Sequence, residues 1–233
     1  MKELTSRQAG LLTMLYIIAM KFLTYPSLYA KYASDKGYVA IAMACASDLV
    51  MLLVITWIMK KKPNHNYFNL IKEKFGSMTA KIISFLMFLF FFVKGVYIVK
   101  EYHIFSLEIL FDFLNKQFSI IPLIFLIGFI MFKGMRSIGR SVEIFIIIIM
   151  AGILITIILP LKSADFSNLL PLGNLNFNAV TDAYFYCLFS AGDYFVLIML
   201  MGRIKYQKNT IRNIRLYAIS GYIMVILFYV IFF

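Results

Sequence analysis

The sequence predicts an all-α integral membrane protein with about seven transmembrane helices, and three observations lead to this prediction. Hydrophobic residues make up 62% of the 233 residues, and the mean hydropathy is +0.86. A soluble domain of this length cannot bury so much apolar surface. The apolar runs are long, and apolar and polar residues do not alternate in them as in the strands of a membrane barrel. In lipid, a helix satisfies the backbone hydrogen bonds of such a run. The basic residues lie in short clusters between the runs.

The apolar runs divide the chain, which we interpret as one transmembrane domain (1–233), into successive spans. The fourth run is short for a hydrocarbon core of about 30 Å, and a re-entrant segment is the alternative for it. The first run is too long for the core of a signal peptide, so we expect it to be retained. The predicted spans are 11–29, 37–59, 82–99, 119–132, 141–161, 179–201 and 216–233.

The distribution of Lys and Arg predicts the orientation. If all seven spans cross, sixteen basic residues lie on the side of the N-terminus and four on the other side. Cytoplasmic loops are enriched in Lys and Arg, so we expect a multi-pass protein with its N-terminus in the cytoplasm. Omitting the fourth span would place the last basic cluster outside. Topology thus accounts for the net charge of +12, and we expect no nucleic-acid partner.

The connector at 63–81 has the pattern of an amphipathic segment on the cytoplasmic membrane surface. An ordinary connector is the alternative. Its apolar residues are Tyr67, Phe68, Leu70, Ile71 and Phe75, and its charged residues include Lys72, Glu73 and Lys74.

Four ionisable residues stand out well inside predicted spans: Lys21, Asp48, Lys94 and Asp193. Each costs about 2.5–3.5 kcal/mol on insertion scales, so such groups usually face a cavity or a partner. We predict that they serve as ion-coupling groups or charge pairs. Whether Lys21 pairs with Asp48 or with Asp193 stays open.

Two predicted spans have a weak point beside a charge. Pro26 removes a backbone donor and disturbs the turn before it, near Lys21. Ser190, Gly192 and Asp193 combine a hydroxyl, a flexible backbone and a carboxylate. Two interrupted helices at corresponding positions are typical of a transporter site, because their ends present polar groups to a ligand. The alternative is a proline kink and a helix-packing glycine without a ligand.

Lys94, Tyr97, Glu101 and Glu108 follow one stripe of the third predicted span. The stripe either lines a cavity as a polar wall or faces neighbouring helices.

Motifs of catalysis are missing from the sequence. We find no metal-ligand spacing, nucleophile elbow or Gly-rich phosphate loop. Cys45 and Cys187 both lie in apolar segments, so we expect no disulfide. The sequence therefore predicts no enzymatic activity, no cofactor and no metal.

Several short motifs, in order and spacing, are similar to one family. They are Leu4-Thr5-Ser6-Arg7-Gln8, Tyr25-Pro26-Ser27-Leu28, Phe75-Gly76, Gly139-Arg140 with Glu143, and the stretch 189–193. With these motifs the chain resembles the endospore germination permeases, the B subunits of nutrient germinant receptors in the amino acid, polyamine and organocation transporter superfamily.

The resemblance implies the inverted five-helix-repeat (LeuT-like) transporter fold, with helices one and six broken around a central amino-acid site. Residues 1–161 would form the first repeat and 162–233 a partial second one. The chain ends inside an apolar run, so we expect either a chain truncated in the second repeat or a last helix that ends at the bilayer surface. Ala19 stands where the family usually has glycine. Carried over by position, the ligand site would be lined by Ala19, Met20, Lys21, Phe22, Leu23, Tyr97, Ser190, Ala191, Gly192 and Asp193.

The resemblance also implies a function. The chain would be a membrane subunit of a spore germinant receptor, acting with A and C subunits in the cell or spore inner membrane. It would recognise a small nutrient such as an amino acid, with or without transporting it. A stand-alone amino-acid and cation symporter is one alternative. A non-transporting scaffold or truncated remnant is the other.

Overall fold

The computed structural model describes residues 4–24, 29, 31–32, 37–63, 65–106, 116–162, 177–186 and 192–232. Over these residues the regular secondary structure is helical, and one isolated parallel bridge joins Leu4 and Ile204. The predicted all-α class is confirmed. The helices are α1 (Ser6–Thr24), α3 (Gly37–Lys61), α4 (Tyr67–Phe105), α5 (Lys116–Lys133), α6 (Met135–Ile158), α7 (Phe177–Tyr186), α8 (Phe195–Leu200) and α9 (Thr210–Phe232), and the 3-10 turn Leu159–Lys162 follows α6.

Four helices of the described residues are long and apolar enough to cross a membrane: α3, α4, α6 and α9. Helix α5 adds a shorter apolar segment, Ile120–Lys133. The chain is therefore a membrane protein by length and composition of its helices. That all seven predicted segments cross stays a prediction, and so does the arrangement of 1–161 and 162–233 as inverted repeats.

The third span starts earlier than predicted, because α4 runs from Tyr67 to Phe105 as two helical parts joined at a kink at Gly76, whose φ is 86°. Because glycine has no Cβ, the chain turns there and resumes the helix at once. The sixth predicted span is interrupted at the weak point that the sequence indicated, because residues 192–194 lie outside both α7 and α8.

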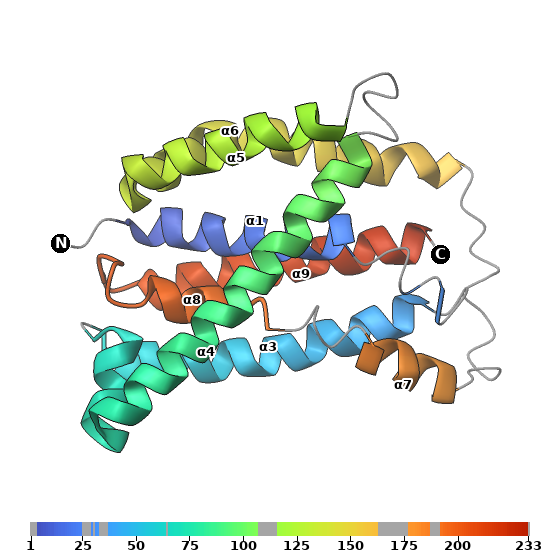
Figure 1. Cartoon of the computed structure of the whole chain (residues 1–233). Helices are drawn as coiled ribbons and strands as arrows, with labels where there is room; N and C mark the ends of the chain where they lie inside the picture. Colours follow the sequence, from blue (N-terminus) through green and yellow to red (C-terminus); the bar gives the residue numbers. More distant parts are fainter. Residues whose placement is uncertain are drawn as a thin grey trace.

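Helices α1 and α9 form the centre of the molecule and pack closely along their lengths (Figure 1). A Cβ at Gly10 would overlap the Tyr217 ring, and one at Gly221 would lie 3.2 Å from the Met14 side chain. Small residues let membrane helices approach in this way. Helix α4 crosses the pair diagonally, and α5 and α6 lie together along the top of Figure 1.

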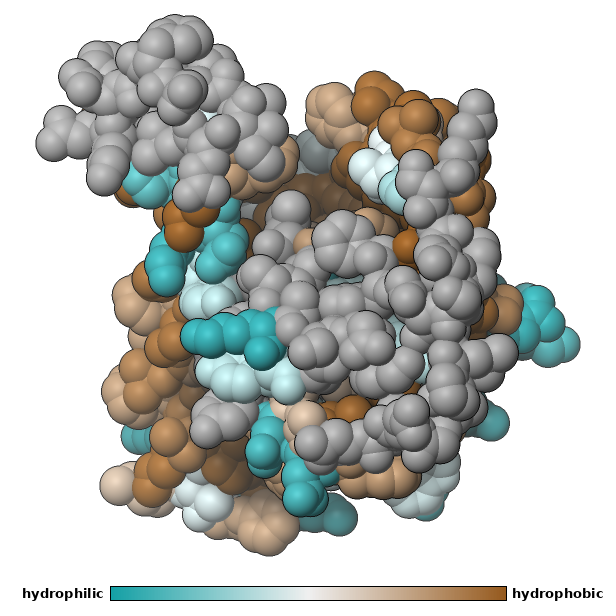
Figure 2. All heavy atoms as spheres, turned by 90° about the vertical axis from the view of Figure 1, so that its right-hand side faces the viewer, coloured by the Kyte–Doolittle hydropathy of each residue, from teal (hydrophilic) through white to brown (hydrophobic). Residues whose placement is uncertain are grey.

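The apolar side chains of α4, α5 and α6 point outward. Phe92 is 58% exposed, Phe125 75% and Ile147 75%. Figure 2 shows hydrophobic side chains gathered on the left and upper-right flanks of one end of the molecule. In water such a surface would be unfavourable, but in a bilayer it faces lipid tails.

One end of the molecule gathers the N-terminus, the α3–α4 turn, the α5–α6 turn and the α8–α9 loop (Figure 1, left). These segments carry the basic clusters that the charge pattern places on one side. At this end Leu4 N–H donates to the Arg203 carbonyl (3.1 Å), and the Leu4 carbonyl accepts from Lys205 N–H (2.8 Å).

Two of the family-like motifs meet at this end. Thr5 and Gln8 form a capping box, with Gln8 N–H donating to Thr5 Oγ1 (3.2 Å) and Thr5 N–H to Gln8 Oε1 (3.0 Å). Gln8 Nε2 then donates to Glu143 Oε2 on α6 at 2.9 Å. A Cβ at Gly139 would lie 2.7 Å from the Leu4 side chain, so the start of α1 lies directly on α6.

The contact of α1 with α9 yields a first prediction. Gly10→Leu should lower stability by about 1–3 kcal/mol, because the added side chain must displace the Tyr217 ring. The measurement is the thermal unfolding midpoint of the purified protein in detergent. Gly152→Leu on α6 is the matched control, since a Cβ there meets nothing within 4 Å. Equal midpoints for the two variants would contradict this packing.

Candidate functional site

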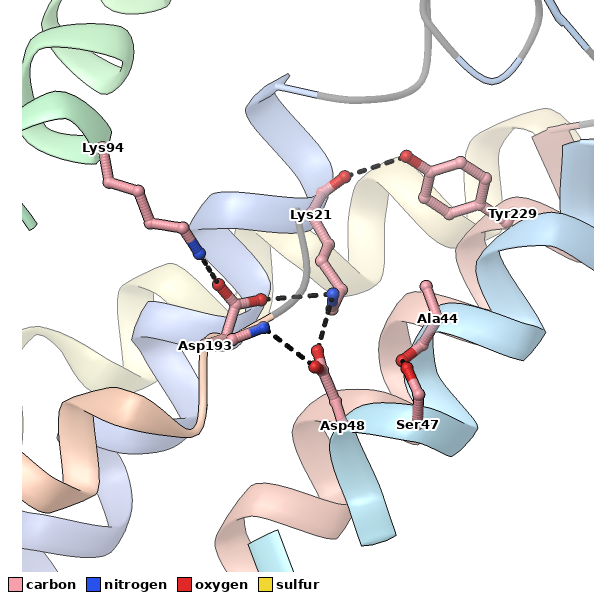
Figure 3. Close-up of polar contacts among 8 residues, drawn as sticks. Lys21, Ala44, Ser47, Asp48, Lys94, Asp193 and Tyr229 are labelled. Carbon is pink, nitrogen blue, oxygen red and sulfur yellow. Dashed lines mark hydrogen bonds and ion pairs between the residues drawn. The ribbon is translucent and has the colours of Figure 1, made fainter. Parts of the chain in front are cut away.

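Four charged side chains meet in the interior, each from a different segment. Lys21 lies in the last turn of α1, Asp48 on α3, Lys94 on α4, and Asp193 in the non-helical residues 192–194. All four are buried, with at most 1% of any side chain exposed. We call them the charge cluster, and Figure 3 shows them pointing toward one another.

The Lys21 ammonium lies between the two carboxylates. Its Nζ is 3.0 Å from Asp48 Oδ2 and 3.2 Å from Asp193 Oδ2. Lys94 Nζ donates to the other oxygen of Asp193, Oδ1, at 3.0 Å. The question that the sequence left open is thus answered, because Lys21 pairs with both aspartates. Two ammonium groups and two carboxylates carry no net formal charge.

The pairing follows from the cost of burying ions. An isolated ion in an apolar interior costs several kcal/mol even after relaxation. Opposite charges at about 3 Å offset that cost only when their remaining polar atoms also have partners. The charge cluster meets this need in part through the backbone, since Gly192 N–H donates to Asp48 Oδ1 at 3.0 Å.

Gly192 holds the irregular segment against the cluster. Its φ of 88° lies in the left-handed region, where a side chain is strained. A Cβ there would also lie 3.1 Å from the Phe90 ring and 3.0 Å from the Phe195 ring. Because residue 192 is outside a helix, its N–H is available to Asp48 rather than to a helical carbonyl.

The end of α1 lies beside the cluster. The last carbonyls of a helix have no partner within it, and the Lys21 carbonyl accepts from the Tyr229 hydroxyl of α9 at 2.9 Å (Figure 3). Helix α1 is continuous as far as Thr24, so Ala19, Met20, Lys21, Phe22 and Leu23 are all helical. A break at Pro26 stays a prediction. Pro26 itself lies outside the described residues.

The other predicted site residues have different neighbours. Met20 is fully buried and Ala19 half-buried on α1. The Phe22 ring stacks on Phe228 with centroids 4.2 Å apart. Tyr97 is half-buried on α4, with Lys100 Nζ 5.8 Å from its ring centroid. Ser190 and Ala191 lie outside the described residues, as does Glu108 of the α4 stripe, so the polar wall stays a prediction.

Sequence reasoning missed Tyr222 and Tyr229 on α9. Tyr222 is 1% exposed, and Lys21 Nζ lies 5.9 Å from its ring centroid. Within the described part of the chain its hydroxyl has no hydrogen-bond partner. The two tyrosines are seven residues apart and so share one helix face. This spacing in an apolar run is the signal that was available.

No group of three or more His, Cys, Asp or Glu that would hold a metal occurs among the described residues. The site combines paired charges, the Gly192 N–H bound to Asp48, and the Tyr222 hydroxyl, which has no hydrogen-bond partner among the described residues.

The charge balance yields a second prediction. Lys21→Met leaves two buried carboxylates with one ammonium, and should cost about 3–5 kcal/mol of stability. Adding Asp48→Asn restores a neutral set, Lys94 with Asp193, and should regain more than half of the loss. Thermal midpoints in detergent measure both, with Lys31→Met as the exposed control. A double variant no more stable than Lys21→Met would contradict charge balance as the cause.

The sequence was compared with protein families, curated proteins and solved structures. No curated protein and no solved structure matches the chain. A family model described as spore germination protein matches residues 3–233, essentially the whole chain. This match includes α1, α3, α4 and the segment with Asp193, and it confirms the resemblance carried by the short motifs. The chain belongs to the spore germination protein family.

Proposed function

We propose that the chain is a membrane subunit of a spore germinant receptor that recognises a small zwitterionic nutrient such as an amino acid. Family membership supports a role in germination. The observation that carries the ligand proposal is the buried charge cluster beside the end of α1 and the non-helical residues 192–194. Ionisable groups in membrane interiors commonly mark substrate or ion pathways.

The cluster has chemistry that suits a zwitterion. A ligand ammonium group would pair with Asp48 or Asp193, and a ligand carboxylate with Lys94 or Lys21. The cluster is already paired, so a ligand must exchange contacts rather than fill a vacancy. A zwitterion brings one charge of each sign and keeps the set neutral, whereas a singly charged ligand would leave an unbalanced charge in the interior.

The remaining parts of the proposal follow the family and the charge pattern. The subunit would act with A and C subunits in the spore inner membrane, without catalysing a reaction. Its N-terminus would face the cytoplasm, which the gathering of basic segments at one end of the molecule supports (Figure 1).

A second candidate is a non-transporting scaffold, and one observation favours it. The ion pairs of the cluster join four segments and satisfy much of its charge without a ligand. In that case the cluster would serve stability alone. The two candidates differ in whether a nutrient binds at Asp193.

The third prediction tests nutrient binding. A thermal-shift screen against the amino acids should give a selective rise in midpoint, because a ligand that binds only the folded state stabilises it. Asp193→Asn and Gly192→Leu should abolish both this shift and the germination response of spores that carry the variants. Asp182→Asn, which removes an exposed carboxylate on α7, is the control and should leave both intact.

No shift with any amino acid, in a well-folded sample, would favour the scaffold. Uptake into proteoliposomes that depends on a pH gradient would instead favour a stand-alone amino-acid and cation symporter.

The fourth prediction separates ligand contact from packing on α9. Tyr222→Phe removes a hydroxyl without a described partner, so stability should hold or rise, while the nutrient shift weakens. Tyr229→Phe removes the bond to the Lys21 carbonyl and should cost about 1 kcal/mol of stability. Thermal midpoints with and without the nutrient measure both effects. An unchanged shift in Tyr222→Phe would exclude this hydroxyl from the ligand site.

A further inference from the structure

The turn between α3 and α4 forms a basic surface at the end of the molecule that holds the N-terminus (Figure 1). The only acidic residue of the segment 57–81 is Glu73, which lies 3.9 Å from Lys62 Nζ and 3.2 Å from His65 Nε2. One carboxylate cannot neutralise the surface. Its lysines, all exposed, are Lys60, Lys61, Lys62, Lys72, Lys74 and Lys81.

Large apolar side chains are exposed among these lysines. Phe75 is 66% exposed and Met78 71%, on either side of the kink at Gly76. Trp57 is 53% exposed on the last turns of α3, and Lys61 Nζ lies 3.8 Å from its ring centroid. Apolar and cationic groups thus occupy the same surface, at the ends of two helices long enough to cross a membrane.

The kink at Gly76 separates a lysine-bearing part of α4 from its apolar part. Residues 67–75 precede the kink and carry Lys72 and Lys74, while the apolar part of α4 follows it. The Asn66 side chain caps the start, accepting from Asn69 N–H at 2.8 Å. The short helical segment before the kink is therefore a capped unit at the end of the spanning helix.

We propose that this surface binds the anionic headgroups of membrane lipids. The lysines would attract the lipid phosphates, while Trp57, Phe75 and Met78 would enter the boundary between headgroups and acyl chains. Charge complementarity favours an anionic lipid over a neutral one. The exposed apolar residues favour a lipid over a free anion, because an inorganic ion offers nothing for them to contact.

Trp57 is the only tryptophan of the chain and lies in the proposed surface, so it reports directly on the lipids there. The full chain is reconstituted in vesicles of phosphatidylcholine with a fixed share of phosphatidylglycerol. Two samples are compared: in one, part of the phosphatidylglycerol is brominated, and in the other, the same mole fraction of phosphatidylcholine is brominated. Brominated phosphatidylglycerol should quench Trp57 at least about twofold more than brominated phosphatidylcholine, because each lysine attracts anionic lipid.

Two controls make the test specific. Lys60→Gln, Lys61→Gln, Lys72→Gln and Lys74→Gln together should bring the two quenchers to parity. The double variant Lys31→Gln, Lys100→Gln should keep the difference between the two quenchers. It is a matched control, because both lysines are exposed and lie near an aromatic ring: Lys31 is 5.6 Å from the Tyr32 centroid and Lys100 is 5.8 Å from that of Tyr97. If the fourfold variant does not fold, raising the salt concentration on the wild-type chain replaces it, since salt weakens the attraction.

Equal quenching by the two lipids in the wild-type chain would overturn the proposal and favour an acidic segment of another protein as the occupant. Unequal quenching that persists in the folded fourfold variant would overturn the role of the lysines. The test uses no nutrient, so its outcome is independent of the proposed ligand site.

Discussion

The ion pairs of the Lys21 ammonium with Asp48 and Asp193 are the interaction on which the rest of the structure depends. The two carboxylates come from segments 145 residues apart in sequence, α3 and residues 192–194, and Lys21 holds both within 3.2 Å. Lys94 adds α4 to the same set. Because unpaired ions are so costly in an apolar interior, few other arrangements of these four segments keep all four charges satisfied.

Within the described part of the chain, most polar contacts between segments concentrate in two places. One is the charge cluster, and the other is the end where Leu4, Gln8 and Glu143 bond across α1, α6 and the α8–α9 loop. At that end Arg215 Nε also donates to Thr56 Oγ1 at 2.7 Å, which joins α9 to α3. Between them, α1 and α9 meet through glycines, so the helices are held both by contact and by polar bonds.

The paired charges of the cluster bear on both the stability and the proposed function of the chain. A site whose charges are already paired is stable without a ligand, and a zwitterion that exchanges those pairs would alter the contacts of every segment the cluster joins. Residues 192–194 lie outside α7 and α8, and the Gly192 N–H donates to Asp48 rather than to a helical carbonyl. A receptor of the proposed kind needs such an element, whose position depends on which charges it pairs with.

The sequence by itself determined the all-α membrane class, the weak point beside Asp193, the four buried charges and the family. These follow from hydropathy, from the cost of ions in lipid and from short local motifs, which are all readable along the chain. It could not decide that Lys21 pairs with both aspartates, or that Tyr222 and Tyr229 face Lys21. Those depend on how helices distant in sequence rotate and approach one another, and only the tertiary structure decides that, because a side chain's partners across a bundle are not encoded in its local spacing.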